Sequence, residues 1–161
     1  MTIYTVGVYG WTADTFADAL VKAGVTALVD IRRRRAARGP RHRFANAKAL
    51  ETLVKAHGVG YLAEPRLSPT AEIRTIQKEA DAESRVQKRD RGVLAPRFIE
   101  AYERDILTEY SLTDLDALMV KTGRSPVFLC VERHPLACHR SLAAIWVATR
   151  VNGYVTHLTP P

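Results

Sequence analysis

Cysteine is scarce in this chain, which holds two among its 161 residues. Two cysteines are too few for a disulfide framework, so a small secreted disulfide-rich domain is excluded. The chain has no run of about 18 apolar residues, and no basic segment precedes an apolar one near its N-terminus. We therefore expect no membrane-spanning helix, no secretory signal, and a cytoplasmic location in which Cys130 and Cys138 are free thiols.

Acidic residues are fewer than basic ones: 17 Asp and Glu stand against 24 Lys and Arg, for a net charge of +7. Hydrophobic residues make up 47% and charged residues 25%, as in ordinary folded domains, which excludes whole-chain disorder, collagen and coiled coil. The length predicts a single domain over residues 1–161. The positive charge favours an anionic small molecule or a nucleic acid as partner and leaves a homodimer open.

Five short apolar runs predict strands, and their lack of polar alternation suits a parallel sheet covered by helices. The runs are Ile3–Val8, Val25–Ile31, Val59–Leu62, Val127–Val131 and Tyr154–Leu158. Segments with helical spacing lie between most of them, which gives βαβ units with right-handed crossovers. The predicted fold is a three-layer α/β fold, Rossmann-like, with a mainly parallel sheet flanked by helices.

Residues expected at helix N-termini predict where five helices begin. They are Thr12 or Asp14, Asn46, Pro96, Leu112, and Cys138 or His139. In the last of these helices we expect the inward face to carry the following residues: Leu142, Ile145, Trp146 and Thr149.

The charged excursion at about residues 63–95 interrupts the alternation of strands and helices. Six basic and five acidic residues lie between Glu72 and Arg91, with few apolar ones. Two interpretations stay open. The segment is either an exposed helix with a mobile loop or a lid over a site, since long connections in compact domains are often lids.

Ligands of open α/β sheets bind outside the carboxyl ends of the strands, which directs attention to the segments that follow strands one, two and four. In the first of these segments, Gly7 and Gly10 allow a tight turn, but the dinucleotide fingerprint G-x-G-x-x-G is absent. Gly7 and Trp11 are candidate ligand-binding residues. Trp11 either stacks on a ring of the ligand or belongs to the core.

The second segment, Asp30–Arg43, contains seven arginines and one aspartate. Asp30 ends an apolar strand, so its carboxylate needs a buried partner, and Arg32 is the expected one. Guanidinium groups bind phosphate in a bidentate manner, so the cluster suits a phosphate-bearing ligand. A solvated basic loop is the alternative.

The third segment, Cys130–Ser141, is the most distinctive. Cys138 lies where a helix begins, and the helix dipole together with His139 and Arg140 is expected to favour its thiolate. Such a thiolate is a nucleophile. Glu132 is expected to orient a histidine or to anchor an arginine.

Other interpretations of this segment stay open. Cys130, Cys138 and His139, with or without His134, form a conceivable zinc site, although the spacing matches no standard ligand pattern. A redox pair is conceivable, although the sulfurs are eight residues apart rather than in C-x-x-C. A third possibility is that both thiols are structural, which we favour for Cys130 alone. We expect neither a metal nor another cofactor.

The order of motifs resembles the bacterial and archaeal family called domain of unknown function 488. The residues that carry the resemblance are Thr5-Val6-Gly7, Val29-Asp30-Ile31-Arg32, Phe44, Gly58-Val59-Gly60-Tyr61, Leu129–Arg140 and Val155–Leu158. The chain departs from the pattern at His134, where an acidic residue is common, and at Val8-Tyr9-Gly10, which replaces a histidine-containing loop. The resemblance implies an α/β domain with both cysteines, Asp30 and Arg32 at one sheet edge, and it supplies no substrate.

Three functional hypotheses follow from these motifs. The leading one is a cysteine-dependent hydrolase or transferase acting on a phosphorylated or nucleotide-like substrate. Its candidate catalytic residues are Cys138, Asp30, Cys130 and His139, and its candidate ligand-binding residues are Gly7, Trp11, Arg32, Glu132 and Arg140. The second is a nucleic-acid-binding module that uses the arginine-rich loop, and the third is a redox-sensing thiol protein.

Overall fold

The computed structural model describes residues 1–161 and contains one sheet of five parallel strands in the order β3-β2-β4-β1-β5. The strands are β1 (Thr2–Gly7), β2 (Ala27–Asp30), β3 (Gly60–Ala63), β4 (Pro126–Cys130) and β5 (Tyr154–Leu158). Each lies within two residues of its predicted position. The three-layer α/β fold predicted from the sequence is confirmed.

Six α-helices connect or flank the strands. They are α1 (Ala13–Lys22), α2 (Ala47–Ala56), α3 (Ala71–Glu83), α4 (Pro96–Tyr102), α5 (Leu112–Thr122) and α6 (His139–Arg150). Thr12 caps α1 through its side chain, Pro96 opens α4, and Cys138 is the residue just before α6, so the predicted start signals hold at these helices. None of the helices has both the length and the apolar composition needed to cross a membrane.

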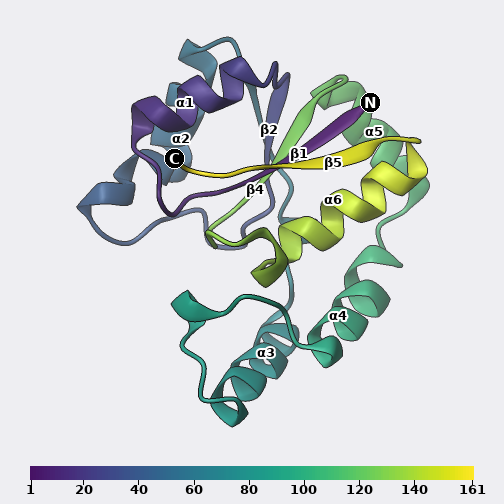
Figure 1. The fold of residues 1–161 in the computed structure, drawn as a ribbon. Coiled ribbons are helices and arrows are strands. Elements are labelled where there is room, and N and C mark those ends of the chain that lie inside the picture. Colours follow the sequence, from purple (N-terminus) through teal and green to yellow (C-terminus); the bar gives the residue numbers. More distant parts are fainter.

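Helices cover both faces of the sheet, as Figure 1 shows. On one face α1 and α2 pack on a cluster that includes Leu28, Val127 and Leu129. On the other, α5 and α6 pack on a cluster that includes Val29 and Phe128. Alternate residues of β2 and β4 therefore pack into opposite cores, which explains why β4 is apolar throughout and β2 is apolar up to Asp30.

The predicted inward face of α6 is wrong at two of its four positions. Ile145 and Thr149 are exposed, whereas Leu142 and Trp146 are only partly buried. The buried face is instead made mainly of small residues: Ala143, Ala144, Val147 and Ala148. Small side chains let the helix backbone lie close to β1 and β4, while the larger side chains lie along the margins of the contact.

The charged excursion contains α3 and a short helical turn, η3 (Lys88–Asp90), and it extends below the sheet together with α4 (Figure 1). Ile73 is buried, and α3 packs against α4. The Gln77 side chain accepts a hydrogen bond from Ala95 N–H, and Arg91 donates one to the carbonyl of Ala137. The excursion is thus tied to the rest of the fold by the packing of α3 against α4 and by the hydrogen bond from Arg91 to Ala137.

Candidate functional site

The carboxyl ends of β2 and β4 meet at a change of direction in the fold. The two strands are neighbours, with Asp30 opposite Leu129. The chain leaves β2 toward α2 on one face and leaves β4 toward α6 on the other. Such divergence opens a crevice at the carboxyl edge, where ligands of open α/β sheets bind.

A cavity of about 390 Å³ occupies this position. Its lining comes from three segments: the loop after β2, the excursion around α3, and the loop between β4 and α6. The residues that matter most for its chemistry are Arg32, Arg33, Arg34, Arg74, Lys78, Asp81, Lys88, Arg91, Cys130, Glu132, Cys138 and His139. The volume suits a small molecule.

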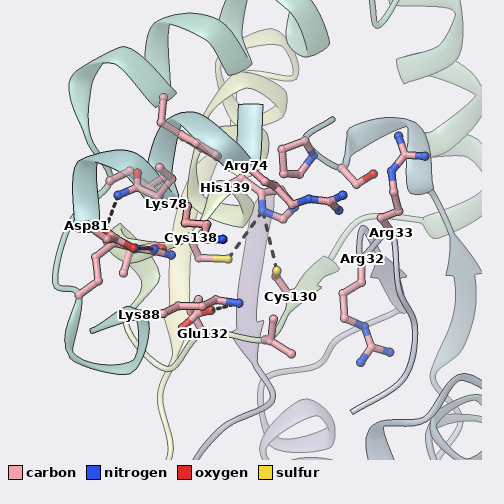
Figure 2. A pocket seen from close by; sticks show the side chains of 18 of the residues that line it. Arg32, Arg33, Arg74, Lys78, Asp81, Lys88, Cys130, Glu132, Cys138 and His139 are labelled. Carbon is pink, nitrogen blue, oxygen red and sulfur yellow. Dashed lines mark hydrogen bonds and ion pairs between the residues drawn. The ribbon is translucent and has the colours of Figure 1, made fainter. Parts of the chain in front are cut away.

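Positive charge dominates the walls of the cavity, which hold seven Arg and Lys against two acidic residues. Both acids are paired, Asp81 with Arg91 at 2.7 Å and Glu132 with Lys88 at 3.3 Å. The other cations, apart from Arg32, form no ion pair: Arg33, Arg34, Arg74 and Lys78. Figure 2 shows Arg33 on one side of the two sulfurs and Lys88 on the other. An anion entering the cavity would meet uncompensated guanidinium and ammonium groups.

Both thiols line this cavity beside one imidazole, and both are nearly buried. His139 Nδ1 is 3.8 Å from Cys130 Sγ and 4.0 Å from Cys138 Sγ, and Figure 2 shows both contacts as dashed lines. These three atoms all lie within 4.8 Å of one another. The strand end supplies Cys130 and the start of α6 supplies the other two residues.

The two thiols differ in acidity. Burial alone would raise the pKa of Cys138, but the neighbouring Cys130 thiol, His139 and the charge of Arg140 together lower that pKa well below its usual value. Interaction with Cys138 and burial raise the pKa of Cys130 well above its usual value. The arrangement therefore favours a thiolate at Cys138 beside a protonated thiol at Cys130.

Arg32, which lines the cavity, forms a bidentate ion pair with Asp30, and both side chains are buried. Arg32 also donates to the Ala45 carbonyl, and the Tyr61 hydroxyl donates to Asp30 at 2.8 Å. Asp30 thus holds an arginine, as expected for a buried carboxylate. This network fixes the start of the arginine-rich loop to Tyr61 of β3.

Arg140 is almost fully buried and donates hydrogen bonds to the carbonyls of Glu132 and Arg133. It holds the loop between β4 and α6 in place and does not line the cavity. Glu132 anchors this arginine through its main chain, while its carboxylate pairs with Lys88. Burial raises the pKa of the Glu132 carboxyl, and the Lys88 ammonium opposes the rise.

The structure gathers only part of the predicted site. The predicted residues that line the cavity are Arg32, Cys130, Glu132, Cys138 and His139, with Asp30 directly behind Arg32. Gly7 and Trp11 do not line it. Gly7 lies against the Glu132 carbonyl, where a Cβ atom would overlap the oxygen, and Trp11 is a buried core residue edge-on to Phe16.

Four basic residues of the excursion were not singled out by sequence reasoning, although they line the cavity: Arg74, Lys78, Lys88 and Arg91. A weak signal exists for the first two, because residues four apart share a face of a helix. Nothing in the local sequence indicates which part of the sheet that face approaches.

Cys130, Cys138 and His139 are also the residues that could hold a metal ion, since two sulfurs and a nitrogen are ligands that zinc prefers. Two observations count against a metal. His139 Nε2 is buried without a hydrogen-bond partner, whereas a metal-bound histidine usually donates its other N–H to an acceptor. The cavity walls are also cationic, which disfavours a second cation. His134, the optional fourth ligand, is exposed.

Comparison with known proteins gives one match. The model of a family described as "Domain of unknown function DUF488" matches residues 12–147, in agreement with the resemblance seen in the motifs. No curated protein and no solved structure matches the chain.

Proposed function

The chain belongs to the domain of unknown function DUF488 family, and we propose that it is a cysteine-dependent enzyme acting on a phosphorylated or nucleotide-like small molecule. The observation that carries the proposal is the position of Cys138. This residue lines a cavity whose walls hold four cations without ion-pair partners. A nucleophile and an anion-binding wall thus face the same space.

In the proposed reaction, the substrate anion binds to cavity cations such as Arg33, Arg74 and Lys78. This places the electrophilic atom of the substrate near Cys138 Sγ. The thiolate forms a bond to that atom, and the leaving group departs with the electrons of the broken bond. His139 is the candidate to protonate the leaving group, since Nδ1 lies 4.0 Å from the attacking sulfur.

A second candidate function is nucleic-acid binding, and the exposed arginines favour it. Six arginines of one segment are exposed: Arg33, Arg34, Arg35, Arg38, Arg41 and Arg43. Only the first two line the cavity. Phosphate contacts need no thiol, so duplex binding of this kind would survive Cys138→Ala. The affinity would fall steeply with salt, with a slope of about −0.9 per phosphate neutralised.

The enzyme proposal is tested by alkylating the reduced protein with iodoacetate, which is an anion, and with neutral iodoacetamide. Relative to the same two reagents on free glutathione, we expect Cys138 to favour iodoacetate by about tenfold, because a cationic cavity concentrates anions. Inorganic phosphate is expected to protect Cys138 by competing for the same cations. Labelled peptides are quantified by mass spectrometry.

A matched pair of double variants makes the test specific. Arg74→Ala with Lys78→Ala removes two exposed charges that line the cavity, whereas Arg38→Ala with Arg41→Ala removes two exposed charges outside it. Only the first pair should clearly reduce the preference for iodoacetate and the protection by phosphate, because it removes two of the four unpaired cations of the cavity. An equal effect of both pairs, or no preference in the wild-type protein, would overturn the proposal.

A further inference from the structure

Both thiols of the chain lie in one cavity, which raises the question of what Cys130 contributes. We infer that Cys130 and Cys138 form a reversible redox pair, in which a hydroperoxide oxidises Cys138 and Cys130 then closes a disulfide. Oxidation would remove the nucleophile of the proposed function and so switch the enzyme off. The inference rests on the proposed function for this consequence only; the thiol chemistry stands on the geometry.

The first supporting observation is the distance between the sulfurs, which is at most 4.8 Å. A disulfide needs about 2.05 Å, so closure requires a relative movement of less than about 3 Å. Cys130 is fixed in a central strand opposite Gly7, whereas Cys138 lies between the short turn η5 (Pro135–Ala137) and α6. A turn at the junction of two helices can adjust more readily than a paired strand, so we expect Cys138 to move.

The second observation is access. Both cysteines line the cavity, although each is nearly buried when its exposure to bulk water is measured. A molecule as small as a hydroperoxide can therefore reach the sulfurs from the cavity of about 390 Å³. Burial away from the cavity protects the same sulfurs from larger thiols and from a second protein molecule.

The first step is attack by the Cys138 thiolate on one oxygen of the hydroperoxide. A sulfur–oxygen bond forms and the oxygen–oxygen bond breaks. The leaving oxygen takes the electron pair, receives a proton from protonated His139, whose Nδ1 lies 4.0 Å from Cys138 Sγ, and departs as an alcohol, or as water when the oxidant is hydrogen peroxide. Cys138 is oxidised by two electrons to a sulfenic acid, and the hydroperoxide is reduced by the same two electrons.

The second step joins the two cysteines. The Cys130 thiol loses its proton and attacks the Cys138 sulfur, a sulfur–sulfur bond forms, and the sulfur–oxygen bond breaks with release of water. His139 Nδ1 lies 3.8 Å from Cys130 Sγ and 4.0 Å from Cys138 Sγ. One ring nitrogen can thus take the proton from Cys130 and pass it to the departing hydroxyl. A thiol reductant reverses the disulfide by exchange.

The experiment treats the reduced full-length protein with one equivalent of hydrogen peroxide and maps peptides without reduction. Trypsin cleaves after Arg124, Arg133 and Arg140, so the two cysteines fall in separate peptides, Ser125–Arg133 and His134–Arg140. We expect these peptides to be joined by an intramolecular disulfide in a monomer that dithiothreitol reopens. The joined pair lacks only the two thiol hydrogens.

Two single variants test the order of events. Cys130→Ser should stop at the sulfenic acid, which dimedone labels on Cys138, while the wild-type protein gives at least tenfold less label after the same exposure to peroxide. Cys138→Ser should give no dimedone label on Cys130. Circular dichroism checks that both variants are folded. If either is not, the wild-type protein treated with peroxide and dimedone together still reports the order, because only the Cys138 peptide should carry label.

The outcomes separate this inference from the proposed function. Equal dimedone labelling of the wild-type protein and Cys130→Ser, or disulfides found only between chains, would overturn the redox pair. Preference for iodoacetate and protection by phosphate are measured on the reduced protein, so they can hold or fail independently. If the disulfide forms but Cys138 shows no preference for iodoacetate, the protein is a redox thiol protein and the proposed enzymatic function is refuted.

Discussion

The guanidinium of Arg32 donates two hydrogen bonds to the carboxylate of Asp30, from Nε to Oδ1 at 2.8 Å and from Nη2 to Oδ2 at 2.7 Å, and both side chains are buried. The pair stands at the carboxyl end of β2, where the arginine-rich loop begins. Arg32 is therefore occupied by a protein carboxylate before any ligand arrives. Its Nη1 atom is buried without a hydrogen-bond partner, so this donor and the unpaired cations of the cavity are the groups that we expect a substrate anion to meet.

Removing one partner of this pair is expected to be costly. Asp30→Asn leaves the Arg32 charge buried without its counter-ion, so we expect unfolding free energy to fall by about 3–5 kcal/mol. Urea denaturation measures the loss. The control is Asp105→Asn, which breaks the exposed pair with Arg104 and should leave the urea midpoint close to wild type. A small, equal effect of both variants would contradict the buried ion pair.

Alkylation is expected to distinguish the two cysteines. A lowered pKa means that Cys138 stays deprotonated as the pH falls from about 8.5 through neutrality, so its rate with iodoacetamide should decline only at lower pH. The raised pKa of Cys130 keeps that thiol protonated and slow over the same range. Rate–pH profiles of the two tryptic peptides provide the measurement. Equal, slow labelling of both cysteines at pH 7 would count against Cys138 as the nucleophile.

Gly7 is expected to tolerate no side chain. An alanine Cβ there would overlap the main-chain carbonyl of Glu132, which cannot move without disturbing its bond to Arg140. Gly7→Ala should lower stability by about 1–3 kcal/mol and slow the alkylation of Cys138, because the loop that carries Cys138 must shift. Gly92→Ala is the control, since nothing lies within 4 Å of its Cβ position. Thermal unfolding and labelling are compared for both variants.

Chelation provides a test of the metal alternative. If Cys130 and Cys138 act as a thiol pair assisted by His139 and bind no metal, treatment with EDTA should leave the rate of Cys138 alkylation unchanged within about twofold. Added zinc should not stay bound through gel filtration. Retention of one zinc per chain, lost in His139→Ala, would show instead that Cys130, Cys138 and His139 form a metal site.

Local sequence was sufficient for the sheet and for the helix that begins after Cys138. Strands β2 and β4 have apolar residues on both faces because each strand packs into two cores. The sequence of each strand shows this as an apolar run without polar alternation. The Asp30–Arg32 pair was predictable for a similar reason, because a carboxylate that ends a buried strand needs a cation nearby. Cys138 before a helix was predictable from the residues that follow it.

The inward face of α6 was not predictable from hydrophobicity. Leu142, Ile145 and Trp146 are the largest apolar residues of that helix, yet its alanines lie against the sheet because they allow the closest approach. Which face packs depends on the distance between helix and sheet. That distance is a property of the assembled layers, and periodicity alone does not contain it.

The sequence by itself determined a parallel α/β sheet, its carboxyl edge as the place for a site, and a cysteine–histidine–arginine start to the last helix. Only the tertiary structure decided that α3 and the turn η3 form one wall of the cavity that the two cysteines line. Arg74 and Lys78 belong to that wall. The tertiary structure also decided that Arg140 holds a loop and that Gly7 is needed for close packing. These are contacts between segments far apart in the chain, and no local pattern of residues specifies them.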